Sequence, residues 1–197
     1  MKNLITFRNK KLKNDKIGAF KLPAGKTCPF AGECKTWCYA KVGTYRFPCV
    51  KNFSEESLKA TKQDNFCDRM IGEIRMRKDK GMYALRLHTA GDFYSQEYFD
   101  KWLAIAYAMP DVLIYTYTKS FPFIRWDYLP DNFVIIESEG GTIPADKRRK
   151  HAVVFMDYES AHDAGYVVCD TSELVVFSTN KIGLIAHGAN KNLVGSI

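Results

Sequence analysis

The hydrophobic pattern of the chain contains several short runs with the composition of β-strands. These runs are rich in β-branched and aromatic residues, or alternate apolar with polar side chains, and turn-forming residues flank several of them, as is typical of strands. We predict strands over residues 16–22, 83–88, 112–118, 133–137, 153–156, 166–169 and 174–177.

Between the first and second of these predicted strands, the spacing of apolar residues becomes that of an α-helix. Phe66, Met70 and Ile74 recur every four positions, so we expect one or two amphipathic helices over residues 54–78, starting at Ser54 as the N-cap. Another helix with one apolar face is expected directly before the third predicted strand. Strands that alternate with helices favour an α/β fold with a mainly parallel sheet.

Residues that could do chemistry follow the first four predicted strands. They are the cysteine-rich loop 23–45, then Gly91 and Asp92, then Thr118 and Lys119, and finally Glu137 with Ser138 and Glu139. Ligands of parallel sheets collect at the carboxyl ends of the strands, so we expect these residues to converge on one site. Arg86 and His88, two residues apart on the second strand, are expected to share a face and, if buried, to need partners or a ligand.

Three of the six cysteines, Cys28, Cys34 and Cys38, lie in loop 23–45 with the spacing C-x5-C-x3-C. The N-terminus lacks an apolar secretion signal, so we expect a reducing cytoplasm, where such clusters serve metal or redox chemistry rather than disulfides. Three thiolates can hold three corners of an iron–sulfur cluster, or three positions around zinc with a fourth ligand from elsewhere. The alternative without a metal is that the three cysteines are buried or reduced thiols in an ordinary loop.

The fourth metal position has two distant candidates. Cys169, at the end of a predicted strand, is expected to be a core thiol, whereas His187 is either a ligand, a substrate contact or a packing residue. Without a neighbouring fourth thiolate, one metal atom stays open, which is typical of catalytic rather than structural sites.

A strand followed by three loop cysteines, with the aromatic Trp37 directly before the last one, resembles the radical S-adenosylmethionine (SAM) superfamily. The usual spacing there is C-x3-C-x2-C, which differs from the spacing here. The resemblance implies that Cys28, Cys34 and Cys38 hold a [4Fe-4S] cluster whose open iron chelates SAM, and that Trp37 packs near the adenine. It also implies an enzyme that cleaves SAM reductively and abstracts hydrogen from a substrate, which requires an electron donor.

The same resemblance implies supporting roles at the other strand ends. Gly91 and Asp92 stand where the superfamily carries a segment that meets the SAM amino group, with Asp92 as the acid. Thr118, Lys119 and Glu137 would assist in holding SAM. A chain of 197 residues is too short for a full barrel of roughly 250 residues, so we expect an α/β fold with an abbreviated, open partial (β/α) barrel.

Longer phrases of the sequence, CPFAGECKTWCYAKVGTY, LRLHTAGDFYS and AHG, resemble a phage-encoded family of gene product 88-like proteins. This likeness spans most of the chain. We expect one domain over residues 1–197, with a basic N-terminal arm (1–15) and a metal-cluster loop (23–45), located in the cytoplasm of the phage host.

The net charge of +7 favours polyanionic partners, so a nucleotide or nucleic acid is a weakly preferred substrate over another small molecule. No apolar run reaches the length of a membrane helix. Two other functions stay open: a [4Fe-4S] enzyme without SAM that uses the open iron as a Lewis acid, as in a hydratase or desulfidase, and a non-catalytic, zinc-stabilised nucleic-acid-binding module.

Overall fold

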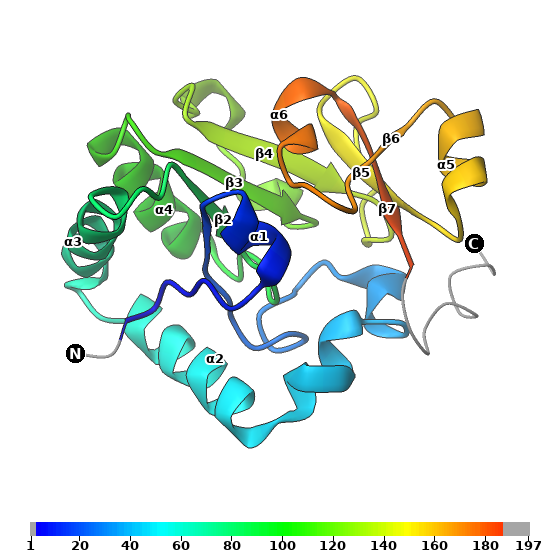
Figure 1. Cartoon of the computed structure of the whole chain (residues 1–197). Coiled ribbons are helices and arrows are strands. Elements are labelled where there is room, and N and C mark those ends of the chain that lie inside the picture. Colours follow the sequence, from blue (N-terminus) through cyan, green and yellow to red (C-terminus); the bar gives the residue numbers. More distant parts are fainter. Residues whose placement is uncertain (1–2, 187–197) are drawn as a thin grey trace.

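A computed structural model describes residues 3–186 of the chain, and its centre is one all-parallel β-sheet (Figure 1). In the described part of the chain, seven strands pair in the order β1-β2-β3-β4-β5-β7-β6. The strands are β1 (Ile17–Ala19), β2 (Ala84–Leu87), β3 (Leu113–Thr118), β4 (Phe133–Ser138), β5 (His151–Phe155), β6 (Val167–Val168) and β7 (Lys181–Ile185). The sheet curls into a half-barrel, which confirms the predicted open partial (β/α) barrel.

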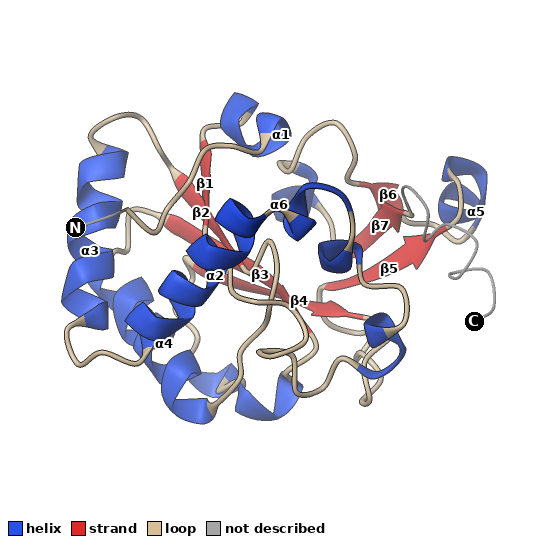
Figure 2. Ribbon diagram, turned by 90° about the horizontal axis from the view of Figure 1, so that it is seen from below, coloured by secondary structure: helices blue, strands red, loops and turns tan. Residues whose placement is uncertain are grey.

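The helices are distributed unevenly around this sheet. They are α1 (Lys10–Asn14), α2 (Pro48–Thr61), α3 (Phe66–Lys78), α4 (Gln96–Ala108), α5 (Tyr158–Asp163) and α6 (Val175–Ser178). Figure 2 shows α3 and α4 beside strands β1–β4, whereas the half formed by β5, β6 and β7 carries the short helix α5. No helix among residues 3–186 is both long and apolar enough to cross a membrane.

Two apolar cores hold the sheet from its opposite faces. On the side of α3 and α4, the rings of Phe20, Phe66 and Trp102 meet edge to face, with centroids 5.2–6.3 Å apart. On the side of α1, the buried Leu12 packs in a second core with Tyr115 of β3. Each fully buried aromatic or aliphatic side chain contributes about 1.5–3 kcal/mol to folding, so both faces stabilise the curl.

The basic N-terminal residues pack on this body. The backbone N–H groups of Leu4 and Ile5 each donate to the buried Glu73 carboxylate of α3 at 2.8 Å. Thr6 forms an antiparallel bridge with Ala19, at the end of β1. These bonds tie the first residues of the described chain to α3 and to the edge strand β1, and α1 follows directly.

Two sequence predictions of secondary structure are wrong. The predicted strand over residues 174–177 is a turn of helix instead, α6 (Val175–Ser178), preceded by Leu174 as its N-cap. The Ser172 hydroxyl and the Glu173 backbone N–H both donate to Asp15 and turn the chain, so that Val176 is buried in the core on the α1 side. A four-residue apolar run carries no period that separates the two structures. The strand that pairs with β5 is instead β7, which follows at Lys181–Ile185.

The predicted start of the helical region at Ser54 is also wrong, because the helix begins earlier. Helix α2 begins at Pro48, because proline at the first helical position loses no needed N–H bond. Ser54 therefore lies within the helix and donates its hydroxyl to the carbonyl of Val50. The chain leaves the helix between Thr61 and Phe66, so the region predicted as one or two helices contains two.

Candidate functional site

A cavity of about 410 Å³ opens at the carboxyl ends of the central strands. Its walls combine the cysteine loop with the ends of β2, β3 and β4 and the segment before α6, and we call it the cysteine pocket. The side chains that matter for its chemistry are Cys28, Cys34, Cys38, Trp37, Asp92, Lys119, Arg86 and Glu173. The structure thus brings the three loop cysteines, Gly91, Asp92 and Lys119 to one cavity at the strand ends.

Close backbone contacts fix the cysteine loop on the sheet. Gly32 has a φ of 52°, and a Cβ there would lie 2.5 Å from the backbone carbon of Gly141, in the loop after β4. Cys34 donates its N–H to the carbonyl of Gly140 at 3.2 Å. On the other side, Gly91 has a φ of 83°, and its bare Cα lets the end of β2 approach Leu22. Glycine serves at both points because it alone leaves room for the neighbouring chain.

The three thiols are half-buried and near enough to affect one another's ionisation. The hydrogen bond between the Cys34 and Cys38 thiols raises the pKa of Cys34 and lowers that of Cys38 to about 6. Burial raises the pKa of Cys28. Lys119 favours the thiolate forms of Cys34 and Cys38. Among residues 3–186, no three His, Cys, Asp or Glu side chains are grouped so that they could hold a metal ion.

Asp92 is a buried carboxylate that the end of β3 holds in place. It accepts the Thr118 hydroxyl at 2.6 Å and the Lys119 backbone N–H at 2.8 Å. Burial raises the pKa of Asp92, and these hydrogen bonds oppose the rise. Lys119 extends its ammonium to the Ser138 hydroxyl at 2.6 Å. Thr118 therefore acts on the pocket through Asp92.

Trp37 and Glu137 have different positions relative to the pocket. Trp37 is buried, lines the pocket and lies 3.3 Å from where a Cβ on Gly140 would stand. Glu137 is also buried, but its carboxylate accepts the Asp146 N–H at 2.6 Å and lies 3.3 Å from the Arg149 guanidinium. The structure does not bring Glu137 to the pocket, because its neighbour Ser138 takes the wall position on β4.

Arg86 and His88 both line the cysteine pocket, but their side chains bond partners on opposite faces of the sheet, contrary to the predicted shared face. His88 has a φ of 55°, which ends the strand alternation, and its ring bonds Thr116 at 3.2 Å and Tyr98 at 3.0 Å on the side of α4. Burial lowers the pKa of His88 to about 3, so the ring is neutral. Arg86 lies toward α1 and pairs with Glu173.

Glu173 is the pocket residue that sequence reasoning missed. Its fully buried carboxylate pairs with Arg86 at 2.8 Å and Lys11 at 2.6 Å, and accepts the Tyr115 hydroxyl at 2.9 Å. Burial raises the pKa of Glu173, but the two cations outweigh it and hold the pKa below its usual value. Glu173 lies among polar residues between short apolar runs, so no periodicity pointed to it.

Cys169 is buried beside this network, as the core-thiol prediction expected, yet it also lines the cysteine pocket. The Tyr117 hydroxyl lies 3.8 Å from its sulfur. Burial raises the pKa of the Cys169 thiol, which favours the neutral form. The other candidate for a fourth ligand, His187, lies outside the described residues.

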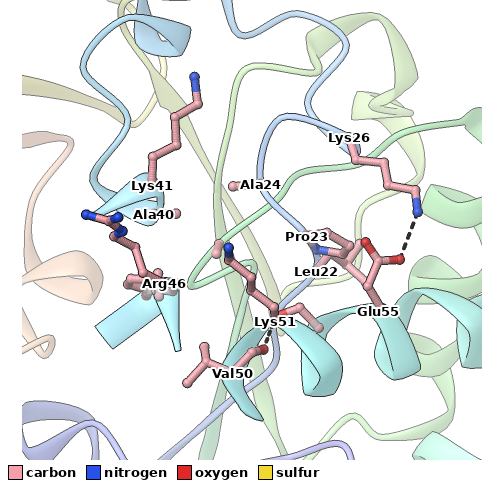
Figure 3. Close-up of a pocket in the computed structure, with 13 residues that line it drawn as sticks. Leu22, Pro23, Ala24, Lys26, Ala40, Lys41, Arg46, Val50, Lys51 and Glu55 are labelled. Atoms are coloured by element: carbon pink, nitrogen blue, oxygen red, sulfur yellow. Dashed lines mark hydrogen bonds and ion pairs between the residues drawn. The ribbon is translucent and has the colours of Figure 1, made fainter. Parts of the chain in front are cut away.

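A second cavity of about 370 Å³ lies between the cysteine loop and α2 (Figure 3). We call it the basic pocket, because Lys26, Lys41, Arg46 and Lys51 line it together with one acid, Glu55. Three small residues, Ala24, Ala40 and Ala90, line both cavities. The two pockets are therefore neighbours that share a wall.

Comparison with known proteins adds a family to this geometry. No curated protein and no solved structure matches the chain. The family model described as Gene product 88 matches residues 2–194, and so includes every element of the half-barrel and both pockets. The chain belongs to the Gene product 88 family.

Proposed function

We propose that the protein is a radical-SAM-like iron–sulfur enzyme, with Cys28, Cys34 and Cys38 as the ligands of a [4Fe-4S] cluster. The observation that carries this proposal is the meeting of three thiols from one loop with a buried carboxylate in one cavity at the ends of parallel strands. When bound, the cluster would supply the electron for reductive cleavage of SAM, and the resulting radical would abstract hydrogen from the substrate.

The three cysteine thiols are the type of ligand that an iron–sulfur cluster binds. Each iron at the rim of a cluster takes one thiolate, so the three sulfurs need not converge on one point as they would around a lone ion. Cys34 lies in the short turn η1 (Gly32–Lys35), Cys38 directly precedes η2 (Tyr39–Lys41), and Cys28 lies in the loop before η1. These half-buried thiols can change rotamer without disturbing the core. Loading requires such rotation, because the thiols are not grouped around a metal position in the described chain.

The remaining pocket residues suit the charged end of SAM. Asp92 presents a carboxylate already fixed by Thr118 and the Lys119 N–H, so it can accept an ammonium group with little reordering. Lys119 can reach a carboxylate, and Trp37 supplies an aromatic wall. The cavity of about 410 Å³ falls in the range of small-molecule sites. Glu137, bonded to Asp146 and Arg149, takes no part in this assignment.

The experiment for SAM binding uses protein reconstituted with iron and sulfide under anaerobic conditions. Electron paramagnetic resonance (EPR) spectra of the reduced protein are recorded with and without SAM, and 5′-deoxyadenosine is measured after reduction. We expect SAM to change the spectrum and 5′-deoxyadenosine to form. Asp92→Asn should weaken both effects by about tenfold or more, consistent with loss of a charged hydrogen bond, whereas Asp111→Asn, at an exposed turn, should leave them unchanged.

Other outcomes separate the competing functions. A cluster whose spectrum ignores SAM would favour Lewis-acid chemistry at the open iron. A colourless protein with stoichiometric zinc would favour a nucleic-acid-binding module. The active form would need an electron donor and a reducing compartment, for which we propose the host cytoplasm.

The interaction between Cys34 and Cys38 favours one second candidate, a dithiol redox function. A thiolate with a lowered pKa, here Cys38, is the reactive partner in thiol–disulfide exchange. In that reaction the two thiols would become a disulfide while a substrate disulfide takes up the two electrons and two protons. Protein that contains no metal after anaerobic preparation, but forms a Cys34–Cys38 disulfide with oxidised glutathione, would support it.

A further inference from the structure

The basic pocket has more positive charge than its carboxylates can balance. Lys26 pairs with Glu55 at 2.8 Å, and Lys41 donates to the carbonyl of Lys35 at 2.6 Å. Arg46 and Lys51 have no acidic partner among the residues that the structure describes. Figure 3 shows Arg46 at the left of this pocket and Lys51 in its middle, whereas the ammonium of Lys41 extends away from them and that of Lys26 is turned to Glu55.

Cations without an acidic partner among the described residues also occur elsewhere on the surface, for example Lys59 and Lys62, but those of the basic pocket line one concave surface. Arg125 is paired with Asp100 at 2.7 Å, Lys78 with Asp111 at 2.9 Å and Arg148 with Asp146 at 2.9 Å. Exposed cations outside the pocket thus sit beside acids in several places. Concentrated, unpaired cations in a concave surface raise the local concentration of anions.

The positive region continues behind the pocket wall. The ammonium of Lys21 lies 5.9 Å from the ring centre of Tyr45 and 5.1 Å from that of Phe53. Burial lowers the pKa of Lys21, and repulsion from Arg8 lowers it further. Lys21 therefore lies behind Tyr45 of the pocket wall, next to the cations that line the pocket.

A pair of aromatic rings connects the two pockets. Tyr45 lines the basic pocket and Tyr39 lines the cysteine pocket. Their rings meet edge to face at 5.7 Å, and both hydroxyls donate to the carbonyl of Thr89, at 3.0 Å and 2.7 Å. Tyr39 keeps 48% of its surface exposed, so its ring is open to a ligand. Cations beside exposed aromatic rings are typical of nucleotide and single-strand binding.

We propose that the basic pocket binds the phosphate group of a nucleotide unit, free or within a nucleic-acid strand. Arg46 and Lys51 contact the phosphate, Lys41 completes the positive rim, and the Tyr39–Tyr45 pair contacts the base or sugar. Because Ala24, Ala40 and Ala90 form the shared wall, the rest of the ligand extends toward the cysteine pocket. Only this last step, which makes the ligand the substrate, rests on the proposed function.

The test measures binding of a fluorescein-labelled single-stranded oligonucleotide by anisotropy, and of a nucleoside monophosphate by calorimetry, without SAM or reductant. The test variant is Arg46→Ala/Lys51→Ala. The matched control is Lys59→Ala/Lys62→Ala, which removes the same charge from exposed positions near the end of α2, outside the pocket. Denaturant unfolding of both variants verifies that they are folded.

We expect the pocket variant to weaken oligonucleotide binding by about tenfold or more at moderate salt, and to reduce the slope of log K against log salt by about 1.4. The control should change the affinity less than about twofold. Binding of the oligonucleotide alone identifies a strand as the source of the phosphate, whereas binding of the monophosphate as well identifies a free nucleotide.

Two results would overturn the proposal: no binding of either probe at low salt, or equal losses in the pocket and control variants, which would indicate diffuse attraction by the net charge. The measurement is independent of the cluster chemistry. Failure of SAM cleavage leaves the expected anisotropy result unchanged, and failure of nucleotide binding leaves the SAM-dependent EPR change unaffected.

Discussion

The cysteine pocket and the basic pocket share a wall but hold their charged groups in opposite ways. In the cysteine pocket, Asp92 is bonded to the end of β3, and Arg86 and Lys11 both reach the buried Glu173. In the basic pocket, Arg46 and Lys51 are exposed and form no ion pair with an acid in the described chain.

This difference separates two kinds of function. Buried charges that are held by ion pairs and hydrogen bonds keep one geometry, which is what a site for chemistry needs. Exposed charges without partners add little to stability, and bind anions with an affinity that depends on salt. Substitutions in the first pocket should therefore change stability and cofactor loading, and substitutions in the second should change ligand binding alone.

The largest expected effect follows removal of the Glu173 carboxylate. Glu173→Ala leaves Arg86 as a buried cation without its carboxylate, which costs about 3–5 kcal/mol. The free energy of unfolding in urea measures this loss. Asp111→Ala, which removes a surface pair with Lys78, should cost about 1 kcal/mol or less. Equal effects of the two substitutions would contradict the distinction between the buried network and surface charges.

The fixed position of the cysteine loop predicts a difference between two glycines within it. Gly32 and Gly43 both have positive φ, 52° and 57°, but a Cβ at Gly43 meets no atom within 4 Å. Gly43→Ala should cost about 1 kcal/mol from backbone strain alone. Gly32→Ala adds about 1–3 kcal/mol for the clash with Gly141, and should also lower iron content. Thermal or urea unfolding that gives the same loss for both would show that the loop is not seated on the strand end.

The neutral His88 predicts that stability falls with acid over a defined range. Its folded pKa of about 3 lies below the unfolded value near 6.5, so the unfolded chain binds more protons between these limits. Stability from this residue is complete above pH 6.5 and is lost as the pH falls toward 3, by about 1.4 kcal/mol per pH unit. Urea unfolding at pH 7 and pH 5 should show a difference of about 2 kcal/mol. His88→Gln should lose that difference, and an unchanged pH profile in this variant would contradict the assignment.

The smallest expected effect concerns stability at the basic pocket. Arg46→Ala/Lys51→Ala should change the free energy of unfolding by no more than about 0.5 kcal/mol, because neither side chain forms an ion pair with an acid among residues 3–186. Urea unfolding of this variant beside Glu173→Ala measures both ends of the comparison. A loss above about 1.5 kcal/mol would mean that these cations support the fold, and would remove the contrast between the pockets.

Much of the architecture could be predicted from the sequence, because short β-branched or alternating runs mark the strands and amphipathic segments mark the helices between them. The carboxyl ends of parallel strands share one edge, which predicts where the site residues meet. The cysteine loop, Asp92 and Lys119 followed from that rule and meet in the cysteine pocket. The errors arose where one residue or one short run decides the outcome. The positive φ of His88 reversed its face, and the run at 174–177 was too short to show whether it is strand or helix.

Long-range partners were also beyond sequence reasoning. Glu173 lies 87 residues from Arg86 and 158 residues after Asp15, which accepts its backbone N–H, and nothing local marks those contacts. Glu137 was predicted in the site from its place at the end of β4, but its carboxylate bonds the Asp146 backbone N–H and the Arg149 guanidinium instead. The pattern along one strand predicts the position of a residue on that strand. The partner that its side chain bonds is set by the packing of distant segments, which the pattern does not contain.

The most direct test of the central claim is the iron and acid-labile sulfide content of the protein after anaerobic purification, compared with Cys34→Ala and Cys49→Ala. Cys34 lines the cysteine pocket, whereas Cys49 is exposed on α2 outside it. We predict that the wild type and Cys49→Ala contain iron and sulfide in a one-to-one ratio and in the same amounts as each other. Cys34→Ala should lose both. Equal iron in all three proteins, or none in the reconstituted wild type, would contradict the account.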